Sequence, residues 1–346
     1  MFPADAHACG FYRMRLPARV LAENGFSVEI VEDKALKAQE DIRDGRLLSV
    51  EDPECDIVVL QRPLHPHLFQ AIPMWQKQGS AVVIELDDNF HRIARKHPAW
   101  QYTQDSIGFL ERALQVCDGL TVSTQSLART YSKMIPFQAR CTVLENRLDG
   151  EMVSKVRAED IKRERIVGWA GNPQSHPGDL KEVGKGLDNA LVANNDWQAV
   201  TWSAGNQALL ELGTFGENRP YATFEDGDYF RALRTLGIGL APLIQNTFNA
   251  SKSYLKPMEY GSMGVPCIAS PTPEYKAAKK LGMCLTADYA SGWERKLRLF
   301  MENDDVRLEH AQRAQEASDK LWIQDHIGKW LDAWVGALDS TVRKAA

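Results

Sequence analysis

Short apolar runs alternate with longer amphipathic stretches over the first 146 residues of the chain. Five of these runs have the length and the β-branched content of strands: residues 27–31, 56–60, 81–86, 119–122 and 141–144. In between, apolar residues recur at helical spacing, over residues 16–24, 68–78, 109–117 and 126–134. Strands that alternate with helices predict βαβ units, and therefore a parallel sheet.

The pattern breaks after Asn146 and starts again at Ile166. Residues 151–165 carry many charges and only one short amphipathic helix, so we interpret them as a linker. A second series of strands is predicted at residues 166–171, 199–202, 221–224, 237–241 and 265–270. Two such series predict an α/β protein of two doubly wound, Rossmann-like domains that face each other across a cleft: residues 1–150 and residues 166–318.

Both ends of the chain add to this organisation. A doubly wound domain usually opens with a strand, yet Gly10 arrives almost at once, so the first strand is either a few residues long or absent from the given chain. At the other end, Trp322, Trp330 and Trp334 are spaced by eight and four residues, which places them on one stripe of a helix. We expect the helical segment 319–346 to pack across the domain boundary and to return toward the N-terminal domain.

Composition narrows the class of protein. Hydrophobic residues make up 44% of the chain and charged residues 25%, as in ordinary globular proteins. The net charge of −5 argues against general nucleic-acid binding, which requires a basic face. The apolar runs are far shorter than the ~20 residues of a membrane-spanning helix, and the first residues do not resemble a signal peptide. We therefore expect a cytoplasmic protein without a membrane span.

The cysteine and histidine residues do not form a metal-ligand pattern. Six cysteines are widely scattered, with no C-x-x-C pair, which argues against a zinc site and a disulfide framework. It favours small buried side chains in a reducing compartment. His65 and His67 flank a proline without a third ligand nearby, so we interpret them as part of a loop at the cleft rim rather than as a metal pair.

The most informative segment follows the strand predicted at residues 237–241. A helix is predicted to begin near Ser251 or Ser253 and to run to about Met263. Free backbone N–H groups at such a start, together with Lys252, suit a diphosphate. Glu259 lies about two turns further along, some 9 Å at 1.5 Å per residue, which is within reach of a ribose. Taken alone, the segment is better explained as a surface helix.

Four segments in sequence order resemble the retaining "group 1" family of glycosyltransferases, which have the GT-B fold. Residues 248–270, which contain Glu259 followed by Gly264-Val265-Pro266, resemble the helix of the nucleotide-sugar (donor) site. Residues 165–180 resemble the first strand and glycine turn of the donor domain. Residues 123–127 with 143–149 resemble the last strands and the hinge of the acceptor domain, and residues 10–25 resemble its first loop and helix. The ordered set covers almost the whole chain.

The resemblance implies transfer of a hexosyl group from a nucleotide sugar, UDP- or GDP-linked, to an acceptor hydroxyl, with retention of configuration and without a metal or other cofactor. It implies that Glu259 holds the nucleotide ribose. Ser251 stands where the family usually has a first glutamate, which contacts the donor sugar. The acceptor stays open: a glycan, a lipid, a small molecule or a protein. The predicted donor-binding residues are Gly10, Arg13, Gly171, Asn172, His176, Ser251, Lys252, Ser253, Tyr254 and Glu259.

Polar residues also follow the strand predicted at residues 81–86, at the end where open α/β sheets build their sites. We predict that Asp87, Asp88 and His91 are catalytic residues near the acceptor hydroxyl or the donor sugar. A metal site is the first alternative, and capping of the next helix by Asp88 is the second. Arg13 is predicted to meet the donor phosphate or an anionic acceptor, or else to be a solvated residue at a helix start.

Three further interpretations stay open. Tyr221 and Phe224 either flank the nucleobase or belong to the core. A sugar-nucleotide epimerase of the same fold would convert a nucleotide sugar with no acceptor present, because fold does not fix function. A non-catalytic nucleotide-binding protein is the third possibility, and Ser251 in place of the first glutamate motivates it.

Overall fold

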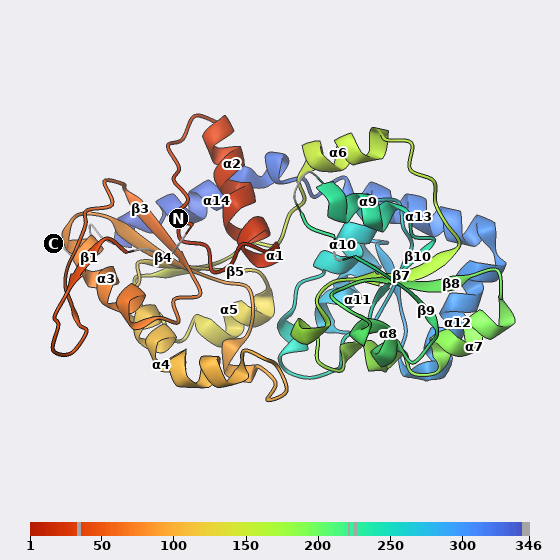
Figure 1. Ribbon diagram of the computed structural model, residues 1–346. Helices are drawn as coiled ribbons and strands as arrows, with labels where there is room; N and C mark the ends of the chain where they lie inside the picture. The colour runs from red at the N-terminus through yellow and green to blue at the C-terminus, as the bar shows by residue number, and fades with distance from the viewer. Residues whose placement is uncertain (33–35, 221, 225–226, 341–346) are drawn as a thin grey trace. The chain divides into compact units, whose positions relative to one another are not determined.

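The computed structural model describes residues 1–32, 36–220, 222–224 and 227–340, and the chain forms two compact units (Figure 1). The first unit comprises Met1–Arg95, Ala99–Arg147 and the described residues from Ile323 onward, and the second comprises Lys96–Pro98 and Leu148–Trp322. The stretch expected to be a linker contains the helix α6 (Gly150–Ala158), which lies in the second unit.

The first unit is built on a parallel sheet with the strand order β3-β4-β5-β6. Its strands are β3 (Ile57–Gln61), β4 (Ala81–Leu86), β5 (Gly119–Val122) and β6 (Arg140–Val143). Its main helices are α2 (Leu16–Glu23), α3 (Pro66–Lys77), α4 (Trp100–Val116), α5 (Gln125–Tyr131) and α14 (Ile323–Val335). Strands β3, β4 and β5 are almost wholly buried, because helices cover both faces of the sheet.

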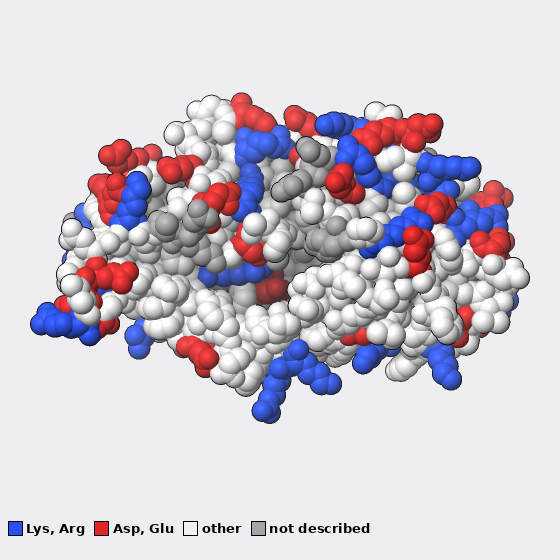
Figure 2. Space-filling view, viewed as in Figure 1, with Lys and Arg blue, Asp and Glu red and all other residues white. Residues whose placement is uncertain are grey.

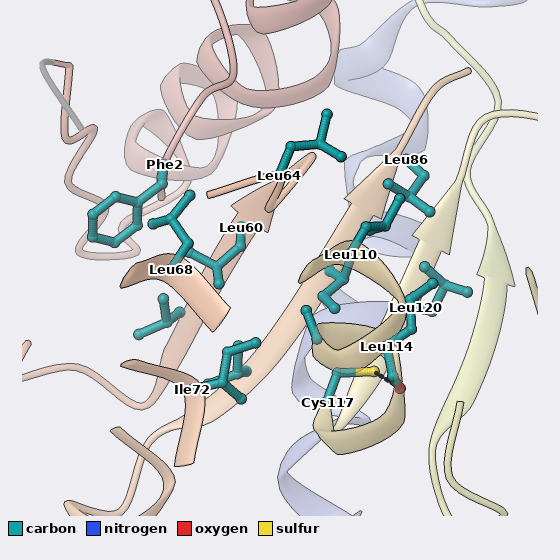
Figure 3. Close-up of a cluster of buried hydrophobic side chains, with 14 of the residues drawn as sticks. Phe2, Leu60, Leu64, Leu68, Ile72, Leu86, Leu110, Leu114, Cys117 and Leu120 are labelled. Carbon is teal, nitrogen blue, oxygen red and sulfur yellow. Dashed lines mark hydrogen bonds between the residues drawn. The ribbon is translucent and has the colours of Figure 1, made fainter. Parts of the chain in front are cut away.

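The core of the first unit lies between its sheet and the pair α3 and α4. Figure 3 shows leucine side chains of β3, β4 and β5 and of α3 and α4 pointing toward one another, with Phe2 at one edge. At the end of α4, Cys117 is buried and its thiol donates a hydrogen bond to the carbonyl of Leu114 at 3.3 Å. On the other face of the sheet, α14 packs against α2 and β5.

The start of the chain fits the first of the two predicted alternatives, a first strand of only a few residues. Phe2 forms a single parallel bridge with Leu60, so the strand is only a few residues long. Residues 27–31 do not form a strand. They run beside the first residue, because the Met1 amino group donates to the Glu29 carbonyl at 2.8 Å and the Val31 N–H donates to the Met1 carbonyl at 2.9 Å. An unpredicted antiparallel pair, β1 (Ala38–Glu40) and β2 (Leu47–Val50), follows.

The second unit contains a six-stranded sheet with the order β12-β11-β10-β7-β8-β9, in which all pairs are parallel. The strands are β7 (Ile166–Ala170), β8 (Gln198–Trp202), β9 (Gly216–Arg219), β10 (Ile238–Ala241), β11 (Cys267–Ala269) and β12 (Cys284–Thr286). The chain winds outward from β7 to β9, returns to β10 and winds outward again. This is the Rossmann order, and its switch point lies between β7 and β10.

Helices connect these strands: α7 (Gly186–Ala193), α8 (Gln207–Leu212), α9 (Asp228–Arg234), α10 (Leu255–Ser262) and α11 (Pro273–Lys280). The helices α12 (Tyr289–Glu302) and α13 (Asp304–Ser318) follow the last strand. The strand predicted at residues 221–224 is wrong. The chain forms β9 at residues 216–219 instead, a polar strand on the sheet edge that has no apolar run to reveal it. Tyr221 lies outside the described residues.

Of the three tryptophans predicted to form one stripe near the C-terminus, Trp330 and Trp334 lie in the first unit and Trp322 lies in the second. Trp330 and Trp334 are buried on α14, with 5.6 Å between their ring centroids, whereas Trp322 precedes the helix. On the face shown in Figure 2, basic and acidic side chains intermingle over both units. Within the described part of the chain, no helix is both long enough and apolar enough to cross a bilayer.

Candidate functional site

At the switch point of the second sheet, Asp179 joins the loop after β7 to the loop after β10. Its side chain is buried. One oxygen, Oδ1, accepts hydrogen bonds from the Ile244 N–H at 2.9 Å and from Nδ2 of Asn249 at 2.7 Å. The other, Oδ2, lies 3.0 Å from Nδ1 of His176. The predicted donor residue His176 and the segment that follows β10 are therefore held together, at the edge where open α/β sheets bind ligands.

The His176 ring is partly buried beside Trp169, with 5.8 Å between the ring centroids. Burial lowers the pKa of His176, the hydrogen bond with Asp179 opposes that shift, and the charges of Lys252 and Lys256 lower the pKa further. The ring is uncharged at neutral pH, and the carboxylate acceptor selects the tautomer with its proton on Nδ1. Two lysines of the segment after β10 thus act electrostatically on the loop after β7.

Gly171 and Asn172 shape the loop that leads to His176. A Cβ atom on Gly171 would lie 2.9 Å from the ring of Trp169, so a side chain there would displace the tryptophan. The Asn172 side chain accepts a hydrogen bond from the Gln174 N–H at 3.0 Å and so begins the short 3-10 turn Pro173–Ser175. Both residues position the loop through local contacts.

The helix of the predicted donor segment begins later than expected. Ser251 ends a 3-10 turn, Lys252 is extended, and α10 begins at Leu255, after Tyr254 at its N-cap. Glu259 therefore lies only about one turn from the helix start, near 6 Å rather than 9 Å at 1.5 Å per residue. The reason is local, because the extended backbone of Lys252 interrupts the turn before the helix can form.

The side chains at this helix start differ in exposure. Ser251 is buried, and its Oγ lies 3.4 Å from the carbonyl of Thr247. Tyr254 is buried as well, whereas Lys252 and Ser253 are half-buried. The Lys252 ammonium lies 4.8 Å from the centroid of the Phe248 ring. A positive charge is therefore held over an aromatic face just before the positive end of the α10 dipole.

The Glu259 carboxylate is almost completely buried, at 1% exposure, and two side chains meet one of its oxygens. Tyr229 of α9 donates its hydroxyl hydrogen to Oε2 at 2.7 Å. The ammonium of Lys256 lies 3.3 Å from the same oxygen and also bonds the Tyr229 hydroxyl. Sequence reasoning missed Tyr229, because it lies thirty residues away on another helix. The ring of Phe224 lies 4.6 Å from the Tyr229 ring, centroid to centroid, which places Phe224 beside this cluster.

In the first unit, Asp87 follows β4 and is held by Arg62, which follows β3. Nε of Arg62 lies 2.6 Å from Oδ1 of Asp87, and a second bond joins Nη2 to Oδ2. Burial alone would raise the pKa of Asp87, but the Arg62 guanidinium lowers that pKa to about 2. Nη1 of Arg62 also lies 3.3 Å from Asp5. The backbone of Arg62 has a φ of +49°, a conformation that costs energy in a residue with a side chain.

The other two predicted catalytic residues lie near this pair in sequence. His91 contacts Glu111 through Nε2 at 3.0 Å and the Tyr131 hydroxyl through Nδ1 at 3.4 Å. Asp88 is half-buried, and the cap position of the next turn, Phe90–Arg92, is Asn89 rather than Asp88. The alternative in which Asp88 caps the following helix is therefore not the arrangement in the structure.

The positions of Arg13 and Gly10 do not fit ligand contact. The Arg13 guanidinium is 1% exposed and lies 4.6 Å from the Trp330 ring centroid. Its Nε donates to Glu85 at 2.7 Å, and its Nη1 donates to the Leu144 carbonyl and to Oδ1 of Asn146. A Cβ on Gly10 would lie 1.9 Å from the Asp5 carbonyl oxygen. Both residues are part of the interior of the first unit, a position that an N-terminal Gly and Arg in sequence do not reveal.

A pocket of about 270 Å³ opens in the first unit beside Arg62, lined also by Leu36, Leu64, His65, His67, Leu68 and Tyr102. His65 caps α3, because its Nδ1 accepts from the N–H of His67 at 3.3 Å. The His67 ring lies 3.1 Å from the Gly45 carbonyl. Within the described ranges, no group of three or more His, Cys, Asp or Glu side chains could hold a metal ion.

Comparison with protein families and with curated proteins gives no match to this sequence. Solved structures do share its fold. A trehalose-phosphate synthase (UDP-forming) from Burkholderia xenovorans matches with a TM-score of 0.57 at 12% identity, over 80% of this chain and 72% of the other. A variant of S. aureus TarM in complex with UDP has a TM-score of 0.55 at 12% identity, with coverages of 74% and 51%.

Anabaena HepE in complex with UDP and glucose has a TM-score of 0.54 at 12% identity, over 80% of this chain and 76% of that one. The chain therefore spans between about half and three quarters of the length of these three proteins. At such low identity, the likeness concerns the fold. The chain thus has the fold of two Rossmann-like α/β units, GT-B, that its motifs predict.

Proposed function

We propose that this protein is a glycosyltransferase that moves a hexosyl group from a nucleoside-diphosphate sugar to an acceptor hydroxyl, with retention of configuration and without a metal. The observation that carries the proposal is the Glu259 carboxylate, which is buried and held in place on the helix that follows the switch-point strand β10. Two of the solved structures of this fold contain UDP, which supports a nucleotide as the ligand class.

In this proposal the donor is held by charge and hydrogen bonds around the start of α10. Glu259 accepts hydrogen bonds from the ribose hydroxyls and so orients the nucleotide without taking part in bond making. Lys252, Ser253 and the first N–H groups of α10 face the diphosphate. They stabilise the negative charge that grows on the leaving nucleoside diphosphate in the transition state. His176 is uncharged without ligand, and a neighbouring diphosphate favours its protonated form.

In this proposal the donor sugar meets Ser251 at the position where the family motif has a glutamate. Ser251 offers a short neutral side chain that is already turned toward the carbonyl of Thr247. A serine cannot supply the charged contact of a glutamate to sugar hydroxyls. We therefore propose that the chain recognises its donor chiefly through the nucleotide, and that the sugar is held by weaker contacts.

We assign Asp87 and Asp88 to the acceptor. The bidentate pair with Arg62 fixes the direction of the Asp87 carboxylate. A carboxylate with a pKa of about 2 is a weak base at neutral pH, so Asp87 suits orientation of the acceptor hydroxyl by hydrogen bonding rather than removal of its proton.

The test is calorimetric binding of UDP, GDP and ADP and of their hexose conjugates, each with and without EDTA. We expect one nucleotide to bind saturably and to bind equally well in EDTA. Glu259→Ala should weaken that binding by about 1–3 kcal/mol, because charge-assisted hydrogen bonds to ribose are lost. Glu309→Ala is the control, since Glu309 is exposed on α13 and forms an ion pair with Arg313 of the same helix.

Each outcome decides between the functions. Binding followed by transfer of the hexose to an added hydroxyl compound supports the transferase. Conversion of the nucleotide sugar with no acceptor present would identify an epimerase, and binding without conversion or hydrolysis would identify a nucleotide-binding protein. Equal affinity of wild type and Glu259→Ala would contradict the ribose assignment.

A further inference from the structure

We infer that Tyr229 and Lys256 are positioning residues that aim the Glu259 carboxylate at the nucleotide ribose, so that selection of ribonucleotides over deoxyribonucleotides depends on them. The inference rests on the proposed function, because it assumes that Glu259 meets a ribose. It adds two residues from different places in the fold, one on α9 and one on α10.

The Glu259 carboxylate is held in one orientation. Both partners approach a single oxygen of Glu259, Oε2: the Tyr229 hydroxyl at 2.7 Å and the Lys256 ammonium at 3.3 Å. Because two groups hold Oε2, the plane of the Glu259 carboxyl group is fixed, and the direction of its other oxygen is fixed as well. A ribose has two vicinal hydroxyls, and each of them must find an acceptor lone pair on the carboxylate. Recognition of a ribose by a carboxylate therefore needs this fixed direction.

Tyr229 is itself held firmly in place. Its side chain is 3% exposed, and its ring lies 4.6 Å from the Phe224 ring at an interplanar angle of 31°. The Lys256 ammonium lies 4.9 Å from the centroid of the Tyr229 ring. The Tyr229 N–H also donates to the Thr223 carbonyl at 2.8 Å. Contacts from backbone, ring and hydroxyl therefore leave Tyr229 little freedom to turn away from Glu259.

Lys256 also balances the charge of Glu259. Glu259 is buried, and a buried carboxylate near an incoming diphosphate would repel it unless a cation lies close by. Lys256 supplies that cation at 3.3 Å and is itself 21% exposed. Its charge also acts on His176 across the switch point. Lys256 therefore offsets the negative charge of Glu259 near the start of α10, where the proposed function places the diphosphate of the ligand.

The experiment compares a ribonucleotide with its 2′-deoxy form. The dissociation constants of UDP, GDP and ADP and of 2′-deoxy-UDP, 2′-deoxy-GDP and 2′-deoxy-ADP are measured by calorimetry for wild type, Tyr229→Phe and Lys256→Met. We expect wild type to prefer its ribonucleotide at least tenfold. Tyr229→Phe keeps the ring contacts but loses the hydroxyl donor, and we expect the preference to fall severalfold. Lys256→Met should reduce it in the same direction.

Tyr260→Phe is the matched control. Tyr260 is the neighbour of Glu259 in α10, is fully buried, and donates its hydroxyl hydrogen to the Leu240 carbonyl at 3.0 Å. The substitution removes one buried tyrosine hydrogen bond from the same helix, as Tyr229→Phe does, without touching the carboxylate. We expect a similar loss of thermal stability in both variants and an unchanged ribonucleotide preference in Tyr260→Phe.

The outcomes separate this inference from the proposed function. A wild type that binds none of the nucleotides, or that binds ribo- and deoxy-forms equally, overturns the ribose role of Glu259 and this inference with it. A wild-type preference that survives unchanged in folded Tyr229→Phe and Lys256→Met overturns the inference alone. A preference lost equally in Tyr260→Phe would show a general effect of weakened packing and would also overturn it.

Discussion

Three buried carboxylates show, at the scale of single residues, how the same group is stabilised in three ways. Asp179 accepts from a backbone N–H, an amide and an imidazole. Asp87 is held by a bidentate arginine. Glu85 is fully buried on β4, and among the described residues its Oε2 has no hydrogen-bond partner, although Arg13 donates to Oε1. Full satisfaction stabilises the charged form of a carboxylate, and incomplete satisfaction favours the neutral form.

Glu85 should therefore make the stability of the protein depend on pH. Burial raises the pKa of Glu85 to about 7, although Arg13 opposes the shift. Between its usual pKa of 4.5 and about 7, the unfolded chain has released this proton and the folded chain retains it. The stabilisation is complete below pH 4.5 and is lost as the pH rises through 7. The free energy of unfolding of wild type should decrease over that window by on the order of 2–3 kcal/mol.

Denaturant unfolding at half-unit steps from pH 4.5 to 8 measures this dependence, with Glu85→Gln as the reference. Glutamine does not titrate, so subtraction of the two curves isolates the contribution of Glu85. Parallel curves for wild type and variant would contradict the assignment of a raised pKa.

At the scale of elements, the position of Glu259 depends on how closely α10 packs onto the sheet. Gly239 on β10 leaves space for the Tyr260 ring, and a Cβ at that position would lie 2.6 Å from the ring. The atoms in conflict belong to the inner part of the ring, so the helix as a whole has to move. The next residue of β10, Leu240, also accepts the Tyr260 hydroxyl through its carbonyl. The close approach of helix and strand therefore depends on the ring contact, which needs a glycine on β10 and which Tyr260→Phe would keep.

Gly239→Ala should lower the free energy of unfolding by about 1–3 kcal/mol, because the added methyl group overpacks this contact. It should also weaken nucleotide binding, since Glu259 moves with α10. The control is Gly108→Ala, at an exposed position inside α4 where an added Cβ meets nothing within 4 Å. That variant should gain about 0.5–1 kcal/mol, as expected for alanine in a helix. A loss of stability without loss of binding in Gly239→Ala would separate the helix contact from the site.

Sequence reasoning predicted elements well where one residue type carries the signal. The apolar runs that predict β4, β5 and β10 form buried strands. Their alternation with helices predicts the Rossmann-like arrangement of the strands in the sheets. It failed for β9, a polar strand at a sheet edge, and for the start of α10, where extended Lys252 delays the helix. Periodicity reports burial along one element, and neither of these features depends on it.

The same limit applies to the candidate site. Glu259, Lys252 and His176 were predicted from local motifs, and the structure brings their segments to one sheet edge. Tyr229, Arg62 and Glu85 act through partners that are distant in sequence, so no local pattern marks them. The sequence predicts that Arg13 contacts a ligand, whereas the structure buries Arg13 under Trp330. No local pattern reveals this burial, because Trp330 lies on a helix more than three hundred residues later.

At the scale of the whole molecule, the two units have separate cores, and the first is completed by a distant part of the chain. Trp330 on α14 covers Arg13 in the first unit, while Trp293 on α12 belongs to the core of the second. Both indoles are 1% exposed. Trp330→Ala and Trp293→Ala therefore form a matched pair of large-to-small substitutions, each in one core.

Each of these substitutions should lower the free energy of unfolding of its own unit by about 3–5 kcal/mol. Hydrogen exchange followed by mass spectrometry reads the two cores separately. We expect Trp330→Ala to speed exchange in peptides that contain β4 and β5, and Trp293→Ala to speed exchange in peptides that contain β7 and β10. Acceleration in the same peptides for both variants would show that the units open together.

The place of α14 in the first unit also sets an order of events on the ribosome. The helix is translated after all the strands of both sheets, so the second unit has every one of its strands before the first unit has its last helix. Until then the buried charge of Arg13 lacks the indole that covers it in the finished protein. A chain that ends at Trp322 should therefore expose the first unit to proteases while the second unit, which has all its helices and strands, is already protected.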